Sequence, residues 1–240
     1  MKRVAIAVYA VVAYVAFLAS AVWAIAFLWG VGPLKTVDTG APGSPAVAIA
    51  VDLALLLLFA AQHSMMARGG FKARLTRVLP PVAERSTYVL LASGLLILLF
   101  WQWRPLPATV WNTAWQPAAA LIAAVYVAGW LIVVGSTFMI DHLTFFGLRH
   151  VESAFKESWL YAWVRHPMML GLLITFWATP RMSVGHLLFA TASTGYIVAG
   201  TRLEERDLGR ALGERYLDYA ARVPAFIPLP RRSGQKLSTS

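Results

Sequence analysis

Long apolar runs constrain this chain more than any other feature of its sequence. A helix needs roughly 20 apolar residues to cross the roughly 30 Å hydrocarbon core of a bilayer. Hydrophobic residues make up 59% of the chain and charged residues only 13%, which is unusually apolar for a soluble domain. The apolar runs are Val4–Trp29, Ala46–Met66, Tyr88–Trp101, Ala118–Ile140, Met168–Thr179 and Val184–Thr201. This pattern predicts an all-α, polytopic integral membrane protein.

The last two runs differ from the first four because only a short break, Pro180–Ser183, separates them. The run Met168–Thr179 is about 18 Å long at about 1.5 Å per residue, which is too short to cross a bilayer upright. We therefore expect four long transmembrane helices followed by a helical hairpin whose turn stops short of the far side. Lys2 and Arg3 precede the first run, but that run is too long for a signal peptide, so we expect a retained helix.

No internal repeat divides the chain, and residues 1–230 are expected to form a single membrane domain. The four helices would occupy residues 1–140, and residues 141–230 would form a second half that contains the hairpin. Four leucines are spaced for one apolar helix face and predict that residues 202–230 form a cytoplasmic helical cap. These are Leu203, Leu208, Leu212 and Leu217. Residues 231–240 are polar and are expected to be a disordered tail.

The positive charges of the chain predict its orientation. Only Lys35, Arg104 and Arg181 lie outside residues 1–3, 67–86, 141–167 and 202–240, which hold 18 of the 21 lysines and arginines. The positive-inside rule then places these segments and both termini in the cytoplasm. The basic residues are expected to meet anionic lipid headgroups, and no nucleic-acid-binding pattern accompanies them. The chain has no cysteine, which excludes disulfides and thiolate chemistry of its own.

The stretch Arg165–Gly171 combines a cation, an imidazole and a proline where a polar loop enters the hairpin. Pro167 suits the first turn of a helix, and the free N–H groups of that turn favour an anionic ligand group. Gly171, one turn later, permits a close approach. A charged loop at a membrane surface is the structural alternative.

Ionisable residues from distant parts of the chain are predicted at this same cytoplasmic level. An ionisable cluster at a membrane edge is a functional candidate because burying charge in lipid is costly. Its members are Gln62, His63, Asp141, His142, Arg149, His150, Glu152, Arg165, His166, Glu204 and Glu205. Each also has a structural alternative: His63 can satisfy a helix-end carbonyl, and Glu204 with Glu205 can belong to a surface charge run. Asp52 and His186 lie nearer the other end, so we expect a structural role for Asp52 and consider His186 a weak candidate.

The polar residues do not form any common cofactor motif. None of the histidines shows the i, i+4 pairing of a helical zinc site, so no metal is predicted. The chain also lacks a P-loop, a dinucleotide-binding glycine fingerprint and a nucleophile-elbow serine.

An ordered set of motifs carries a family resemblance. Residues 161–167, Gly171, Glu204-Glu205, Gly213, Tyr216, Tyr219 and Val223-Pro224 resemble the C-terminal half of the isoprenylcysteine carboxyl methyltransferase superfamily. With residues 62–68, Pro80-Pro81, Glu84-Arg85 and 101–105 added, the whole chain is similar to the bacterial methanethiol S-methyltransferases, which neighbour NnrU-like membrane proteins. The resemblance implies a methyltransferase of the bacterial inner membrane that uses S-adenosyl-L-methionine to convert methanethiol to dimethyl sulfide.

The resemblance also implies roles for individual residues. His166, Pro167 and Gly171 would hold the cofactor, with Glu204 or Glu205 near its ribose or amino group. Tyr161 and Tyr216 would border the adenosine, and Arg165 suits the cofactor carboxylate because its guanidinium can bind both oxygens. Arg149, His150 and Met169 are expected on the substrate side. Many relatives have Tyr at the position of Met169, and this departure argues against a prenylcysteine substrate.

A small thiol needs help to lose its proton, because alkyl thiols are weaker acids than cysteine, whose pKa is about 8.5. A positioned base contributes about 10² to 10⁴ in rate. His142, oriented by Asp141, is the first candidate for the base and His63 is the second. Two alternatives stay open: a related enzyme that acts on a prenylcysteine carboxylate or another lipid-like substrate, and a non-catalytic NnrU-like membrane protein.

Overall fold

The protein is an all-helical polytopic membrane protein, as predicted. The computed structural model describes residues 2–41, 43–140, 146, 148 and 159–227. Four helices are long and apolar enough to cross a membrane. They are α1 (Lys2–Trp29), α2 (Pro45–Ala67), α4 (Pro81–Gln102) and α5 (Gln116–Ile140). Proline occupies the first turn of α2 and of α4, where its missing N–H costs no hydrogen bond.

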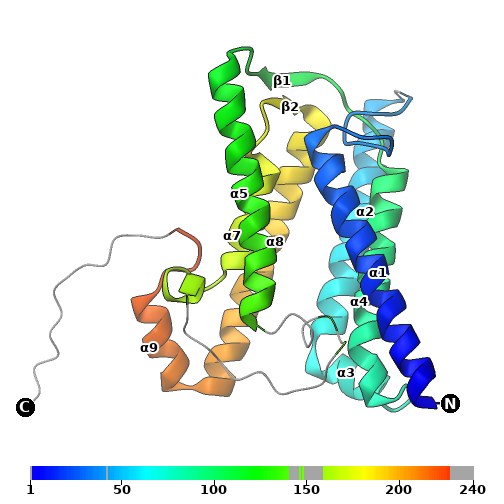
Figure 1. Ribbon diagram of the computed structural model, residues 1–240, viewed down its shortest axis with the longest axis vertical. Coiled ribbons are helices and arrows are strands. Elements are labelled where there is room, and N and C mark those ends of the chain that lie inside the picture. Colours follow the sequence, from blue (N-terminus) through cyan, green and yellow to red (C-terminus); the bar gives the residue numbers. More distant parts are fainter. Residues whose placement is uncertain (1, 42, 141–145, 147, 149–158, 228–240) are drawn as a thin grey trace, which may run out of the picture.

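The helices form two groups, which Figure 1 shows side by side. The first group contains α1, α2 and α4. The second contains α5, α7 (Pro167–Trp177) and α8 (Val184–Leu212). Two short strands lie at one end of the bundle, here called the ribbon end, and the N-terminus, α3 (Gly69–Leu75) and α9 (Glu214–Arg222) lie at the other, here called the basic end. The main core joins the two groups through rings such as Phe27, Trp103 and Phe189.

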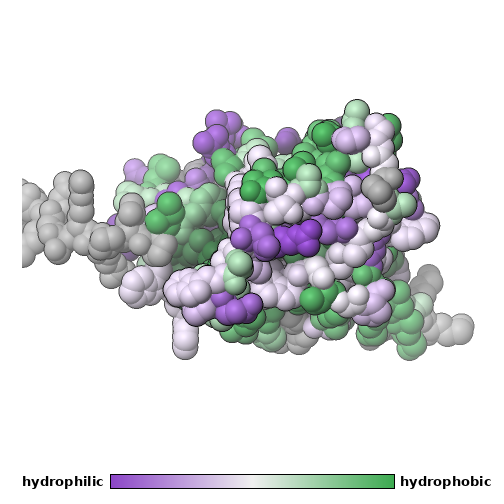
Figure 2. All heavy atoms as spheres, turned by 90° about the horizontal axis from the view of Figure 1, so that it is seen from above, coloured by the Kyte–Doolittle hydropathy of each residue, from purple (hydrophilic) through white to green (hydrophobic). Residues whose placement is uncertain are grey.

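The predicted hairpin is confirmed as α7 and α8, and its turn is covered in a way that the sequence did not indicate. Helix α7 has only 11 residues. The turn between α7 and α8 contains β2 (Arg181–Ser183), which pairs with β1 (Thr109–Asn112) in a two-stranded antiparallel ribbon. This ribbon satisfies backbone groups of the turn, which a membrane protein has to pair internally near lipid. Figure 2, which looks onto the ribbon end, shows a band of hydrophilic residues crossing it between apolar ones.

Polar residues at the ribbon end have structural roles. Asp52 is fully buried and accepts a hydrogen bond of 2.8 Å from the backbone N–H of Arg104, as expected for a structural residue. Lys35 donates to the carbonyl of Trp101. His186 is also buried, and its Nε2 lies 2.9 Å from the carbonyl oxygen of Phe176. These contacts tie the loops of the ribbon end to the helices.

The predicted cap differs from the structure in its first half. Residues 202–212 continue α8 in a straight line, and only α9 folds back, after Gly213 with φ of 59°. The predicted apolar face is half right: Leu208 and Leu212 pack against α9, whereas Leu203 and Leu217 are exposed. The leucine spacing could not predict the turn at Gly213, because apolar residues have the same spacing in one long helix and in two helices joined by a turn.

Candidate functional site

Arg165 is the centre of a hydrogen-bonded cluster at the basic end. Its Nε donates to Glu205 Oε1 at 2.8 Å, and its Nη2 lies 2.6 Å from the same oxygen. Its Nη1 donates to the carbonyl of Ala220 at 2.7 Å and also to that of Val223. The side chain of Arg165 is only 13% exposed. One guanidinium therefore joins the loop before α7, the helix α8, the helix α9 and the residue that follows α9.

His166 is the N-cap residue of α7, and its side chain contacts the carboxylate of Glu205. Its carbonyl accepts the first hydrogen bond of α7, from Leu170, and its side chain makes no cap contact. Nε2 lies 3.1 Å from Glu205 Oε1, and Nδ1 lies 3.8 Å from Glu204. His166 is 8% exposed and Glu204 is 54% exposed. Glu205 thus lies inside the cluster, and Glu204 at its edge.

The backbone fixes this arrangement independently of the side chains. The N–H of Arg165 donates to Pro224 O at 2.9 Å, and that of His166 donates to Ala225 O at 3.1 Å. The ring of Phe226 lies 5.9 Å from that of His166. The segment after α9 is therefore held against the start of α7, and the site is closed from the side of the C-terminus.

Three tyrosines surround the charged cluster. Tyr216 and Tyr219 are buried on the inner face of α9, and the Tyr219 hydroxyl donates to the carbonyl of Tyr161 at 2.7 Å. Burial, assisted by the charge of Glu204, raises the pKa of Tyr161 to about 12. Burial also raises the pKa of Tyr216, and Glu205 adds to this effect. The phenols of Tyr161 and Tyr216 therefore stay neutral at physiological pH.

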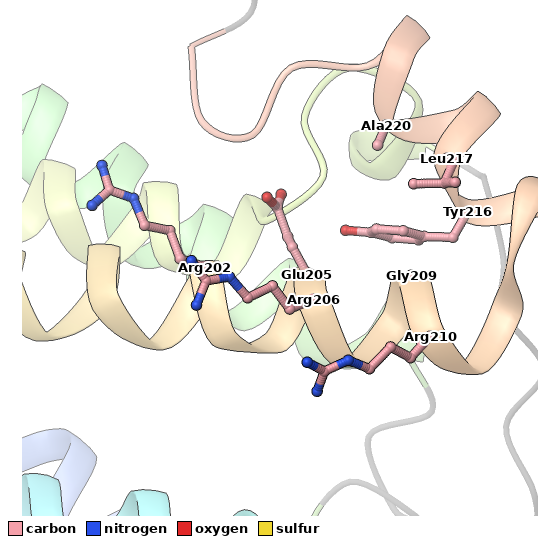
Figure 3. A pocket seen from close by; sticks show the side chains of 8 residues that line it. All are labelled: Arg202, Glu205, Arg206, Gly209, Arg210, Tyr216, Leu217 and Ala220. Carbon is pink, nitrogen blue, oxygen red and sulfur yellow. The ribbon is translucent and has the colours of Figure 1, made fainter.

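A surface groove opens beside this cluster between α8 and α9. Its volume of about 570 Å³ lies within the range of about 300–1,000 Å³ typical of small-molecule sites. The lining residues are Arg202, Glu205, Arg206, Gly209, Arg210, Tyr216, Leu217 and Ala220. Figure 3 shows the Tyr216 hydroxyl pointing toward Glu205, while the three arginine side chains follow α8 along the groove. The groove offers a carboxylate, phenol, apolar surface and cationic groups to one ligand.

The contacts of Arg165 within the protein bear on its expected role, which is to bind the cofactor carboxylate. Arginine has five N–H donors, and the contacts above use four of them. At most one donor is left, so Arg165 cannot grip both oxygens of a ligand carboxylate without breaking its own contacts. The assignment of the cofactor carboxylate to Arg165 stays a prediction, and in the structure Arg165 positions Glu205, α9 and the segment that follows α9. Arg202, Arg206 and Arg210 are exposed cations that line the groove.

The structure brings together most of the predicted cofactor residues: Tyr161, Arg165, His166, Glu204, Glu205 and Tyr216. Pro167 starts α7 and is buried. Gly171 permits a close approach, as expected, but the approaching group is α5: a Cβ at this position would lie 2.7 Å from Gly129 O. Met169 packs against the main core. Four other predicted residues, Asp141, His142, Arg149 and His150, lie outside the described residues.

His63 belongs to a second cluster, which contains residues that the sequence did not indicate. The Tyr88 hydroxyl lies 2.8 Å from His63 Nε2 and 3.1 Å from Nδ1. Ser64 bonds to the Tyr196 hydroxyl at 3.1 Å, and Arg85 lies 5.2 Å from the ring centre of Tyr88. The available signal was weak: Tyr196 lies eight residues before Glu204, so the two side chains are about 80° apart around α8.

Comparison with known proteins agrees with these features. Residues 53–203 match the NnrU protein family. A methanethiol S-methyltransferase of Mycobacterium tuberculosis is 46% identical over 97% of this chain and 99% of its own length. Methanethiol S-methyltransferase 2 of Bradyrhizobium diazoefficiens is 48% identical over 94% of this chain and 91% of its own length. Nurim of Xenopus laevis is 30% identical over 66% of this chain and 62% of its own length.

No solved structure matches the chain. The match to the bacterial proteins covers nearly all of this chain and nearly the full length of each relative. The match to the NnrU family covers more than half of the chain. The chain therefore belongs to the methanethiol S-methyltransferase family.

Proposed function

We propose that this protein transfers a methyl group from S-adenosylmethionine to methanethiol, giving dimethyl sulfide and S-adenosylhomocysteine. One observation carries the proposal: the residues that the family resemblance selects for the cofactor meet in a single cluster beside a groove of suitable size. They come from the loop before α7, from α8 and from α9. The names of the relatives support the thiol as the methyl acceptor.

The groove residues fit the chemical groups of S-adenosylmethionine. Glu205 and the more exposed Glu204 would attract its ammonium group or accept hydrogen bonds from its ribose. Arg202 or Arg206 would bind its carboxylate, because a guanidinium forms paired hydrogen bonds with two oxygens. Tyr216 offers a ring and a neutral hydroxyl. The cofactor supplies a methyl group on a sulfonium sulfur, and the residues of the protein hold that group in line with the acceptor sulfur.

The acceptor has to lose a proton during the transfer. The S–H bond breaks, the sulfur forms a bond to the methyl carbon, and the carbon–sulfonium bond breaks, so one proton remains to be removed by the protein. His142 with Asp141 and His63 are the proposed bases. Arg149, His150 and Met169 are proposed on the substrate side. A base in this position would raise the rate by about 10² to 10⁴.

The distribution of charge supports an orientation with the site on the cytoplasmic side of the bacterial inner membrane. Arginines gather on α8 and α9 near the groove, where they would also contact anionic headgroups. An apolar thiol can reach such a site through the lipid. Reporter fusions are expected to place both termini in the cytoplasm, and a fusion showing either terminus outside would contradict this orientation.

A headspace assay tests the proposed function. Purified protein in lipid nanodiscs is supplied with S-adenosylmethionine and methanethiol, and gas chromatography measures dimethyl sulfide. Steady production of dimethyl sulfide is expected, with an equal amount of S-adenosylhomocysteine. Binding of S-adenosylmethionine without dimethyl sulfide would point instead to another acceptor, such as a prenylcysteine carboxylate. The absence of both binding and product would support a non-catalytic membrane protein.

A further inference from the structure

Within the part of the chain that the structure describes, His63 has one polar partner, the Tyr88 hydroxyl, and three aromatic neighbours. It lies in the last turns of α2, where the Tyr88 hydroxyl of α4 contacts its ring nitrogens at 2.8 and 3.1 Å. Its ring also lies 5.0 Å from that of Tyr88, 5.2 Å from that of Phe59 and 6.4 Å from that of Tyr196 on α8. Three helices thus place aromatic rings and hydroxyl groups around one imidazole.

Charged and amide groups border this cluster on the side of the basic end. Arg85 lies over the Tyr88 ring, and Glu84 precedes it on α4. Glu84 Oε1 and Gln62 Oε1 are both buried, and neither has a hydrogen-bond partner among the described residues. A buried acceptor without a donor costs about 1–3 kcal/mol. Buried polar groups that lack a partner in this way mark this part of the bundle as a functional candidate.

Packing between the two helix groups does not require these polar residues. At the ribbon end the same groups are joined by apolar contacts, in which Phe27 packs against Phe189 with ring centres 5.9 Å apart. At the basic end the junction of α2 and α8 instead contains the hydrogen bond between Ser64 and Tyr196 and the ring contact between His63 and Tyr196. At the basic end, polar contacts therefore take the place that apolar ring contacts have between the two groups at the ribbon end.

Helix α8 connects the two clusters. Tyr196 and Glu204 are eight residues apart, about 12 Å along the helix at about 1.5 Å per residue. A cofactor held by Glu204 and Glu205 could thus extend its sulfonium group toward the aromatic rings. Such rings attract cations and sulfur atoms.

We propose that the cluster of His63, Tyr88 and Tyr196 is the thiol-binding half of the active site, with His63 as the base and Tyr88 as a positioning residue. The proposal rests on the proposed function. The thiol S–H donates to a nitrogen of His63, which takes the proton as the sulfur bonds to the methyl carbon and the carbon–sulfonium bond breaks. The imidazolium then releases its proton to water. Arg85 stabilises negative charge on the sulfur, and the Tyr88 hydroxyl holds the imidazole in place.

Two variants and one matched control test this assignment in the headspace assay. His63→Ala is expected to lower kcat by about 10² or more at pH 7 while the affinity for S-adenosylmethionine changes less than about twofold. Tyr88→Phe is expected to lower kcat by about tenfold at pH 7. Both losses shrink toward pH 9.5, where solution supplies thiolate. The control, Tyr126→Phe, removes another buried hydroxyl bond, 2.7 Å to Ile25 O, and is expected to leave the pH profile of kcat unchanged.

The possible outcomes separate this proposal from the proposed function. Wild-type protein without dimethyl sulfide production would overturn both. Active wild-type protein with unchanged kcat in His63→Ala and Tyr88→Phe would overturn only the thiol site. A loss in Tyr88→Phe that is the same at every pH, like the loss in a merely destabilised protein, would also overturn it. The same applies if His142→Ala, tested in parallel, shows the pH-dependent loss and His63→Ala does not.

Discussion

Arg165 and Glu205 form an ion pair with a shortest distance of 2.6 Å, and this pair decides what each residue is free to do. Four of the five N–H donors of Arg165 contact Glu205 or the carbonyls of Ala220 and Val223. Glu205 contacts Arg165 and His166 through one oxygen, Oε1, and its side chain lines the groove. The carboxylate therefore faces the groove as a preorganised acceptor, and the arginine holds it there.

Removing either of two side chains that are proposed to hold the cofactor should weaken cofactor binding. Glu205→Gln and His166→Ala are each expected to lower the affinity for S-adenosylmethionine by at least about tenfold, because losing one member of a partly buried charged set costs several kcal/mol. Isothermal calorimetry on protein in detergent measures this. Asp207→Asn is the control, since its contact with Arg210 is exposed. Unchanged affinity in both variants would rule out this cluster as the cofactor site.

Arg165→Lys should loosen the segment after α9 even though the charge is kept. A lysine ammonium cannot reach Glu205 and two carbonyls in the geometry of a guanidinium, and each lost charged hydrogen bond costs about 1.5–3 kcal/mol. Trypsin is expected to cut after Arg222 at least about tenfold faster in this variant, because cleavage follows local opening. Arg210→Lys, which changes an exposed arginine, should cut at the wild-type rate. Equal rates in all three proteins would mean that Arg165 does not hold this segment.

Gly171→Ala tests whether this glycine serves packing or ligand binding. Its new Cβ would lie 2.7 Å from Gly129 O and 2.8 Å from Val133 Cγ2, so α5 and α7 would have to separate. Such overpacking costs about 1–3 kcal/mol, and about 1 kcal/mol lowers Tm by about 2–4 °C in a chain of this size. The matched control is Gly195→Ala on α8, where the added methyl meets nothing within 4 Å. Unchanged Tm with weaker cofactor binding would instead support a ligand contact.

Tyr161 should make stability decrease in strongly alkaline solution. Its pKa is raised from 10.0 to about 12, first by burial and then by the charge of Glu204. Because the folded state holds the phenol proton more tightly, the contribution is fully present below pH 10 and is lost as the pH rises through about 12. Tyr161→Phe should therefore show a smaller decrease of Tm between pH 9.5 and 11.5 than the wild type. Equal decreases in the two proteins would contradict the raised pKa.

The sequence by itself determined the features that depend on local composition. Apolar runs long enough to span a bilayer predicted α1, α2, α4 and α5, because the hydrophobic effect and internal backbone pairing leave such a run no other stable state in lipid. The short run after Pro167 predicted the hairpin for the same reason. The order of motifs from Tyr161 to Tyr216 also indicated one shared site, and the structure brings these residues together.

Only the tertiary structure decided which partner each polar group takes. Arg165 has the same charge whether it meets a ligand or the carbonyl of Ala220, and no pattern near it distinguishes the two. Gly171 permits close approach by any group, and the crossing of α5 determined which group it is. Tyr88 and Tyr196 meet His63 from helices far apart in the sequence. Periodicity assigns a residue to a helix face, but hydrogen-bond partners depend on how helices cross, which distant contacts decide.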